Sequence, residues 1–176
     1  MSVTRSVGGL TRRGGVFLLL VSCPMLAVQA QSPIPRPHAD ARAFLDSVYR
    51  VHFRAGQGFP VSTLRARRGW FTPQLYTLLL RDMGPSAARG EVGVLDSDPF
   101  TNAQDVAESY SVGQAAIKGD TIVVSVVINF GASYRPVDRT GRLRVAVLRT
   151  QRGWRIADFL YSDGRSLAAG LRASPS

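Results

Sequence analysis

The sequence predicts an α+β domain in which helices come first and a four-stranded antiparallel sheet follows. Two observations carry this prediction. Apolar residues repeat at helical spacing between residues 39 and 83. From residue 110 onward, runs rich in Val and Ile are separated by short turns that contain glycine, which is typical of a β-meander. Because one face of such a sheet must be covered, we expect the helices to lie on it, so that the curved sheet forms a cone around a cavity.

The first helix is expected over residues 39–53, and a short second helix over residues 63–68. In the first helix one apolar stripe contains Phe44, Val48 and Val51, and a second stripe beside it contains Leu45, Tyr49 and His52.

A third helix is expected to begin at Thr72-Pro73, because threonine is a good N-cap and proline fits the first helical position. Gly84-Pro85 is expected to end it near Met83. Its buried face would be formed by Leu75, Leu78 and Leu79.

The sheet follows an irregular segment over residues 85–105. Lys118-Gly119-Asp120 predicts a hairpin between the first two strands, and the second strand is rich enough in Val and Ile to be buried on much of both faces. A longer loop over 131–141 and a closing helix over 165–172 complete the pattern. The four expected strands cover residues 110–117, 121–130, 142–150 and 154–161.

Residues 1–30 have the features of a cleaved signal peptide. Three arginines precede an apolar run over residues 16–28, which is too short to span a membrane. Small residues at Val28 and Ala30 predict a cut after Ala30, so that the mature chain begins at Gln31. We therefore expect an exported protein, periplasmic or secreted.

An alternative reading of the same segment is lipidation. Leu20-Val21-Ser22-Cys23 resembles a bacterial lipobox, in which Cys23 would be acylated and anchor the protein to a membrane. In either case a proline-rich linker over residues 31–38 leads to one domain over 39–172, with a disordered tail at 173–176. Cys23 is the only cysteine, so the domain has no disulfide, cysteine nucleophile or cysteine metal site.

The chain carries a net charge of +10, almost all of it from arginine, since Lys118 is the only lysine. The densest basic cluster contains Arg65, Arg67 and Arg68 beside Trp70. Such a cluster can bind nucleic acid, but an exported protein is not expected to encounter nucleic acid. Two interpretations of the cluster remain: it contacts an anionic membrane surface, or it is a solvated surface with no partner.

Three segments resemble a bacterial exported family, domain of unknown function 3828, which is similar to the nuclear transport factor 2-like superfamily. These segments are Leu95-Asp96-Ser97-Asp98-Pro99-Phe100, Ala103-Gln104-Asp105 and Gly153-Trp154-Arg155-Ile156-Ala157-Asp158. The resemblance covers about residues 40–171. It implies the nuclear transport factor 2-like cone and an envelope location, but it implies no chemistry.

Asp98, Gln104 and Asp105 match the motif of the resembled family, and they are candidates for a polar site at the mouth of the cone. Alternatively, they tie the irregular segment to backbone amides. Asp158 is expected to share a strand face with Trp154 and Ile156. An inward carboxylate there would suit a general base, whereas one at the end of the sheet would cap the closing helix.

Tyr49 and His52 border the apolar stripe of the first helix, where they could donate hydrogen bonds to a ligand or complete the edge of the core. No spacing in the chain fits a metal site, a phosphate-binding loop or a nucleophile elbow, so no cofactor is expected.

The sequence favours a non-catalytic module that binds a small ligand or an envelope protein. Two alternatives remain open. One is an acid–base enzyme of the isomerase or hydratase type, with an inward carboxylate in the cone. The other is a protein that binds anionic lipid at the membrane surface.

Overall fold

A computed structural model describes residues 37–89, 93–131 and 139–174. All described residues belong to one compact unit. The expected signal peptide with its cut after Ala30, and the alternative lipidation site Cys23, lie outside the described residues. Within these residues, no helix combines the length and apolar character that crossing a bilayer requires.

Helix α1 covers Pro37–Arg54. It begins two residues before the predicted start, because the fixed φ of proline suits the first turn of a helix. The second of the two stripes described from the sequence is buried throughout, together with Val48 of the first, whereas Val51 of the first is 48% exposed. The buried residues of α1 are Ala41, Leu45, Val48, Tyr49 and His52.

Helix α2 covers Val61–Ala66, and a single 3₁₀ turn, η1, follows at Arg68–Trp70. Helix α3 covers Pro73–Arg89. The predicted N-cap is confirmed, because the hydroxyl of Thr72 accepts a hydrogen bond from the backbone N–H of Leu75 at 3.3 Å. Its predicted end near Met83 is wrong. A proline disfavours helical geometry in the preceding residue partly through that residue's Cβ, and Gly84 has none.

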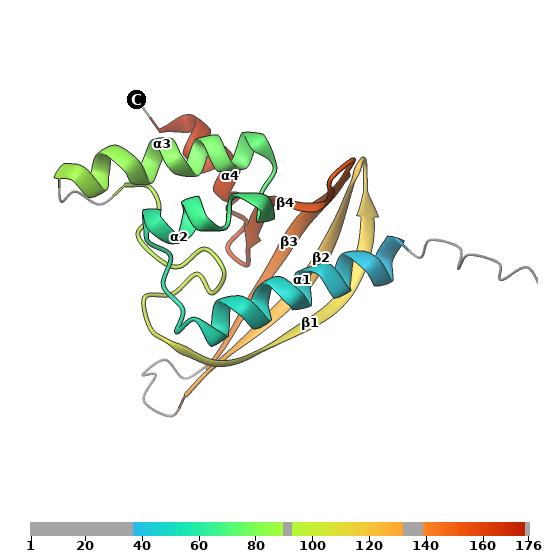
Figure 1. Ribbon diagram of the computed structural model, residues 1–176. Helices are drawn as coiled ribbons and strands as arrows, with labels where there is room; N and C mark the ends of the chain where they lie inside the picture. The colour runs from blue at the N-terminus through green and yellow to red at the C-terminus, as the bar shows by residue number, and fades with distance from the viewer. Residues whose placement is uncertain (1–36, 90–92, 132–138, 175–176) are drawn as a thin grey trace, which may run out of the picture. The chain divides into compact units, whose positions relative to one another are not determined.

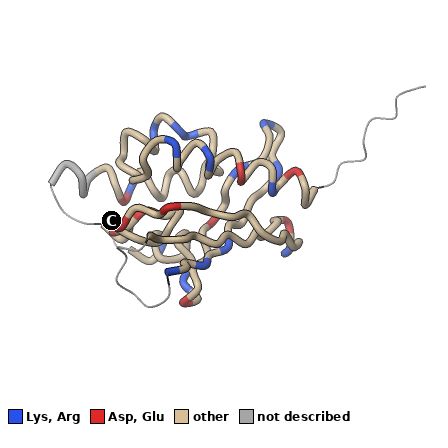
Figure 2. The backbone as a smooth tube through the Cα atoms, turned by 90° about the horizontal axis from the view of Figure 1, so that it is seen from below, with Lys and Arg blue, Asp and Glu red and all other residues tan. Residues whose placement is uncertain are grey.

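The four strands are β1 (Ala107–Lys118), β2 (Thr121–Phe130), β3 (Thr140–Thr150) and β4 (Gly153–Tyr161). All neighbours are antiparallel and the order is β1-β2-β3-β4, so the predicted meander is confirmed. The short helix α4, Leu167–Ala173, closes the domain. The sheet is curved, and the helices form a layer on one side of it (Figures 1 and 2).

Strand β2 lies in the middle of the sheet and alternates strictly. One of its faces is buried and the other is half-buried. The sequence predicted burial on much of both faces, so the second face is less buried than expected. The buried face belongs to the core between the sheet and the helices. Its residues are Ile122, Val124, Val126, Ile128 and Phe130.

Aromatic side chains occupy the space between helices and sheet in which the sequence predicted a cavity. Phe100, which is fully buried, lies at the centre of this cluster. It comes from the segment shortly before β1 and places its ring in the interior, whereas Gln104 and Asp105 of the same segment stay exposed. The rings that surround Phe100 belong to Tyr49, His52, Phe59, Trp70, Phe71 and Phe159.

The free edge of the sheet at β1 is partly covered by side chains. Gln57 has a φ of 60°, and this conformation lets its amide bond both backbone groups of Ala107. Its Oε1 accepts from the N–H of Ala107 at 2.9 Å, and its Nε2 donates to the carbonyl at 2.6 Å. The register of β1 also shifts twice, and such bulges limit pairing with a further strand.

Candidate functional site

A buried polar cluster forms where α1 meets the segment before β1. Nε2 of His52 lies 2.7 Å from Oδ2 of Asp98, and the two side chains are 0% and 8% exposed. Oδ2 of Asp98 also accepts from the N–H of Gly58 at 3.0 Å, and its Oδ1 accepts from the N–H of Phe100 at 2.9 Å. Asp98 therefore ties two chain segments to α1.

The neighbours of His52 fix the position of its proton. Nη1 of Arg67 lies 3.3 Å from Nδ1 of His52. Because a guanidinium group only donates, Nδ1 must accept, and Nε2 then carries the proton and donates to Asp98. The ring also stacks on Phe100, with 4.3 Å between the ring centroids. Both ring nitrogens are thus engaged by protein groups, and the side chain is fully buried.

Tyr49 lies one helical turn before His52 and is fully buried. Its hydroxyl donates to the carbonyl of Phe100 at 2.9 Å. Burial, and then the negative charge of Asp98, raise the pKa of Tyr49 well above its usual value. The hydroxyl is therefore neutral, and its hydrogen bond lies in the core. It holds the backbone at Phe100, to which Asp98 also binds.

Gln104 and Asp105 lie near Asp98 but on the surface. All three line a depression of about 330 Å³, in which Gln104 and Asp105 are exposed. The amide of Gln104 contacts the carbonyl of Asp96 at 3.4 Å. The carboxylate of Asp98 is bonded to His52 and to the backbone N–H groups of Gly58 and Phe100. This agrees with the alternative in which the polar side chains of this segment bind backbone amides.

Asp158 does not share the face of Trp154 and Ile156, so this prediction is wrong. A bulge at Ala157 shifts the register of β4, and Phe159 follows as the next buried residue in place of Asp158. Asp158 instead caps α4, the alternative weighed from the sequence.

The cap is built from both oxygens of the carboxylate. Oδ1 of Asp158 accepts from the N–H of Ala168 at 2.8 Å, and Oδ2 accepts from the hydroxyl of Ser166 at 2.6 Å. That hydroxyl in turn accepts from the N–H of Ala169 at 3.0 Å.

A pocket of about 680 Å³ lies beside the β3–β4 hairpin, at a place the sequence reasoning missed. We call it the hairpin pocket. Three segments far apart in sequence form it: the η1 turn, the first turn of α3 and the hairpin. Its lining residues are Arg68, Gly69, Phe71, Pro73, Tyr76, Thr150, Gln151, Arg152 and Arg155.

Backbone contacts hold the two sides of the hairpin pocket together. Phe71 forms a parallel bridge with Ile156, and the N–H of Thr72 donates to the carbonyl of Ile156 at 2.8 Å. The segment that leads into α3 therefore runs along the free edge of β4. The N-terminal end of α3 also faces the pocket through Pro73 and Tyr76, and this end of a helix carries a partial positive charge.

Hydrogen bonds within the hairpin fix the side chain of Arg155 and the backbone of Arg152. Nη1 of Arg155 donates to the carbonyl of Trp154 at 2.7 Å, and Nη2 donates to the carbonyl of Arg152 at 2.9 Å. The hydroxyl of Thr150 donates to the carbonyl of Gly153 at 2.7 Å and accepts from the N–H of Arg152 at 3.2 Å. Since a guanidinium group has five N–H donors, Arg155 keeps donors for a further partner.

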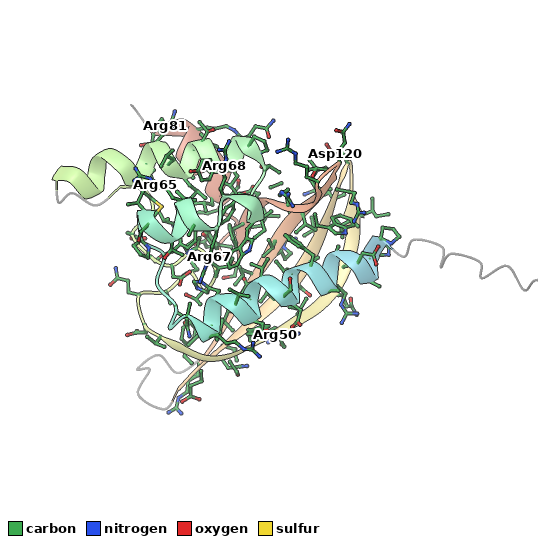
Figure 3. The ribbon with its side chains drawn as sticks, viewed as in Figure 1. Arg50, Arg65, Arg67, Arg68, Arg81 and Asp120 are labelled. Atoms are coloured by element: carbon green, nitrogen blue, oxygen red, sulfur yellow. The ribbon has the colours of Figure 1, made fainter. Side chains whose placement is uncertain are left out.

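The arginines of the hairpin pocket have no acidic partner among the described residues. Arg68 lies over the ring of Tyr76, 5.2 Å from its centroid, and forms no ion pair there. Asp120, in the turn between β1 and β2, lies at the same end of the sheet (Figure 3) but does not line the pocket. Three positive charges thus border a pocket whose floor is apolar.

The three arginines of the basic cluster predicted from the sequence lie in three different environments (Figure 3). Arg65 is exposed on α2. Arg67 turns toward His52 and lies over the ring of Trp70, 4.5 Å from its centroid, and partial burial lowers its pKa. Arg68 lines the hairpin pocket. Contact of these three residues with an anionic membrane remains a prediction.

One sequence signal points to the hairpin pocket. The tripeptide Arg-Gly-Trp occurs twice, at Arg68-Gly69-Trp70 and at Arg152-Gly153-Trp154. The arginines of both copies line the pocket. The repeat alone does not show that the two arginines lie at one pocket, because their proximity depends on the pairing of Phe71 with Ile156.

Comparison with known proteins found no matching family model, no matching curated protein and no matching solved structure. Within residues 37–89, 93–131 and 139–174, no three potential metal ligands gather at one point.

Proposed function

We propose that this chain is a non-catalytic module that binds a small anionic ligand in the hairpin pocket. The observation that carries the proposal is the meeting of Arg68, Arg152 and Arg155 at one pocket without an acidic counter-charge among the described residues. Uncompensated positive charge around a low-dielectric wall attracts anions. The volume of about 680 Å³ is also within the usual range for pockets that hold small molecules.

Several features favour binding over acid–base catalysis. The carboxylate of Asp98 and both nitrogens of His52 are bonded within the core, and Asp158 caps α4. The hairpin pocket itself contributes arginine, threonine, glutamine and tyrosine side chains. Arginine remains protonated near neutral pH, so it provides charge and hydrogen bonds rather than proton transfer.

Calorimetric titration with benzoate and with inorganic phosphate tests the proposal. We expect Arg152→Ala and Arg155→Ala each to weaken the binding of benzoate by about tenfold or more, because each removes charge-assisted hydrogen bonds. Arg65→Ala is the matched control. It removes one positive charge from the neighbouring helix α2 but does not line the pocket, so its effect should stay below about twofold.

Two outcomes contradict the proposal. Absence of binding for every anion excludes an anion site. Equal weakening by Arg65→Ala and Arg155→Ala means that the net charge of the chain, and not the pocket, attracts the anion.

We also propose that the module acts outside the cytoplasm and has the nuclear transport factor 2-like fold of the resembled exported family. The charge and apolar pattern of residues 1–30 support export, and the helices on a curved antiparallel sheet support the fold. Sequencing the amino terminus of the mature protein tests the first point. A start at Gln31 agrees with it, and an acylated Cys23 shows instead that the domain is anchored to a membrane.

A further inference from the structure

We infer that the ligand of the hairpin pocket is an amphiphilic anion, with an acidic head group on an alkyl or aromatic body. This inference rests on the proposed function and narrows it to a class of compound. The apolar floor of the pocket, its size and the open space at Gly69 support it.

The floor of the pocket is apolar. Phe71, Pro73 and Tyr76 line it, and Arg68 lies over the ring of Tyr76. Arg152 and Arg155 come from the hairpin, a different segment from the one that contributes Phe71, Pro73 and Tyr76. A ligand that contacts both parts must therefore have a charged end and an apolar end.

The size of the pocket also argues against a bare inorganic anion. Its volume is about 680 Å³. Liquid water takes about 30 Å³ per molecule, so the pocket has room for on the order of twenty waters. Phosphate or acetate would leave most of this space, and the apolar floor, in contact with water. Burial of that floor adds binding free energy only if the ligand has an apolar body.

Gly69 leaves space on the wall of the pocket. A Cβ built there meets no atom within 4 Å, and the backbone of Gly69 is not in the left-handed region. A side chain at this position can therefore be introduced without backbone strain and projects into open space. Because Gly69 lines the pocket, we expect such a side chain to compete with the body of the ligand while every arginine stays in place.

The test is a titration series with the purified chain. The probes are acetate, hexanoate, octanoate and 2-naphthoate, with inorganic phosphate and the neutral 2-naphthalenemethanol as controls. Each buried methylene should tighten the binding by about fourfold, so octanoate should bind far more tightly than acetate. The neutral alcohol should bind at least about tenfold more weakly than 2-naphthoate, since it lacks the charge that the arginines recognise.

Substitution of Gly69 separates the apolar contact from the charge. Gly69→Leu should weaken 2-naphthoate by about tenfold or more and change acetate by less than about twofold, and Gly69→Ala should lie between. Circular dichroism and thermal unfolding establish that each variant is folded.

Two results overturn the inference. If acetate and phosphate bind as tightly as octanoate and Gly69→Leu has no effect, the pocket is an anion site without an apolar part, and only the proposed function stands. If none of the anions binds, the proposed function itself fails.

A third arm distinguishes a free ligand from a lipid head group. Vesicles of phosphatidylglycerol present the same acidic and apolar chemistry in a bilayer. We expect octanoate to bind to the chain in the absence of vesicles. Cosedimentation with vesicles combined with no binding of free octanoate would contradict a pocket for a soluble amphiphile.

Discussion

Nε2 of His52 and Oδ2 of Asp98 are joined by a 2.7 Å hydrogen bond in the core, 46 residues apart in the sequence. This bond links α1 to the segment that carries Phe100 into the interior. From the sequence, both residues are candidates for a ligand-binding site. In the structure they hold the fold together and leave the surface beside the β3–β4 hairpin as the candidate binding site.

The first prediction concerns this pair. Asp98→Asn and His52→Ala should each lower the free energy of unfolding by about 2–3 kcal/mol, because each leaves a buried polar partner unsatisfied. The double variant should lose less than the sum, with a coupling of about 1–3 kcal/mol. Urea denaturation of the four proteins measures this cycle. Strict additivity would show that the two side chains do not depend on one another.

The cap on α4 gives the second prediction. Asp158→Ala should cost about 0.5–2 kcal/mol, the usual effect of losing a helix cap. Amide hydrogen exchange should quicken at Ala168 and Ala169, whose N–H groups the Asp158 and Ser166 side chains engage. Asp163→Ala is the control, because Asp163 is exposed and pairs with Arg165 on the surface. An equal acceleration in both variants would count against a cap formed by Asp158.

Alkaline unfolding provides the third prediction. Burial raises the pKa of Tyr49 and Tyr161 above the ordinary tyrosine value of 10.0. Because the neutral form is favoured in the folded chain, this contribution to stability is fully present below about pH 10, where tyrosines of the unfolded chain begin to ionise. It is then lost as the pH rises toward the pKa values of the folded chain. The slope is about 1.4 kcal/mol per pH unit for each such tyrosine.

The measurement is the free energy of unfolding from pH 8 to 11. Tyr49→Phe should reduce the slope of the unfolding free energy against pH by the contribution of one tyrosine. It should also lower stability at neutral pH by about 1 kcal/mol, because the carbonyl of Phe100 loses its hydrogen-bond donor. An unchanged slope in this variant would exclude the raised pKa of Tyr49 as a cause.

The clamp at the edge of the sheet gives the fourth prediction. Gln57→Ala removes both hydrogen bonds to Ala107 and keeps a Cβ at a φ of 60°. We expect a loss of about 1–2 kcal/mol and faster hydrogen exchange at Ala107. Gln57→Gly should be less destabilising than Gln57→Ala by about 1 kcal/mol, because glycine adopts this φ freely. The reverse order would contradict the account of the clamp.

Much of the sheet could be predicted from the sequence. The second strand has the predicted bounds, Thr121–Phe130, because the two-residue turn at Gly119-Asp120 and the alternation of Val and Ile are local signals. The same kind of local signal predicts the α+β order of helices and strands. These features depend on neighbouring residues, so periodicity suffices.

The site could not be predicted in the same way. The orientation of Asp158 depends on a bulge at Ala157, and nothing in the local alternation shows it. The hairpin pocket depends on the bridge between Phe71 and Ile156, which lie 85 residues apart. Charge counts could identify the arginines, but only tertiary pairing decides that Arg68 and Arg155 line the same pocket.

The most direct test of the central claim is a map of backbone amide chemical shifts during titration with 2-naphthoate. Binding in the hairpin pocket should move the amides of residues 68–76 and 150–156 first, and Arg155→Ala should suppress these changes at the same ligand concentration. Changes confined to residues 94–106, or to α4 at Leu167–Ala173, would place the ligand elsewhere and contradict the account.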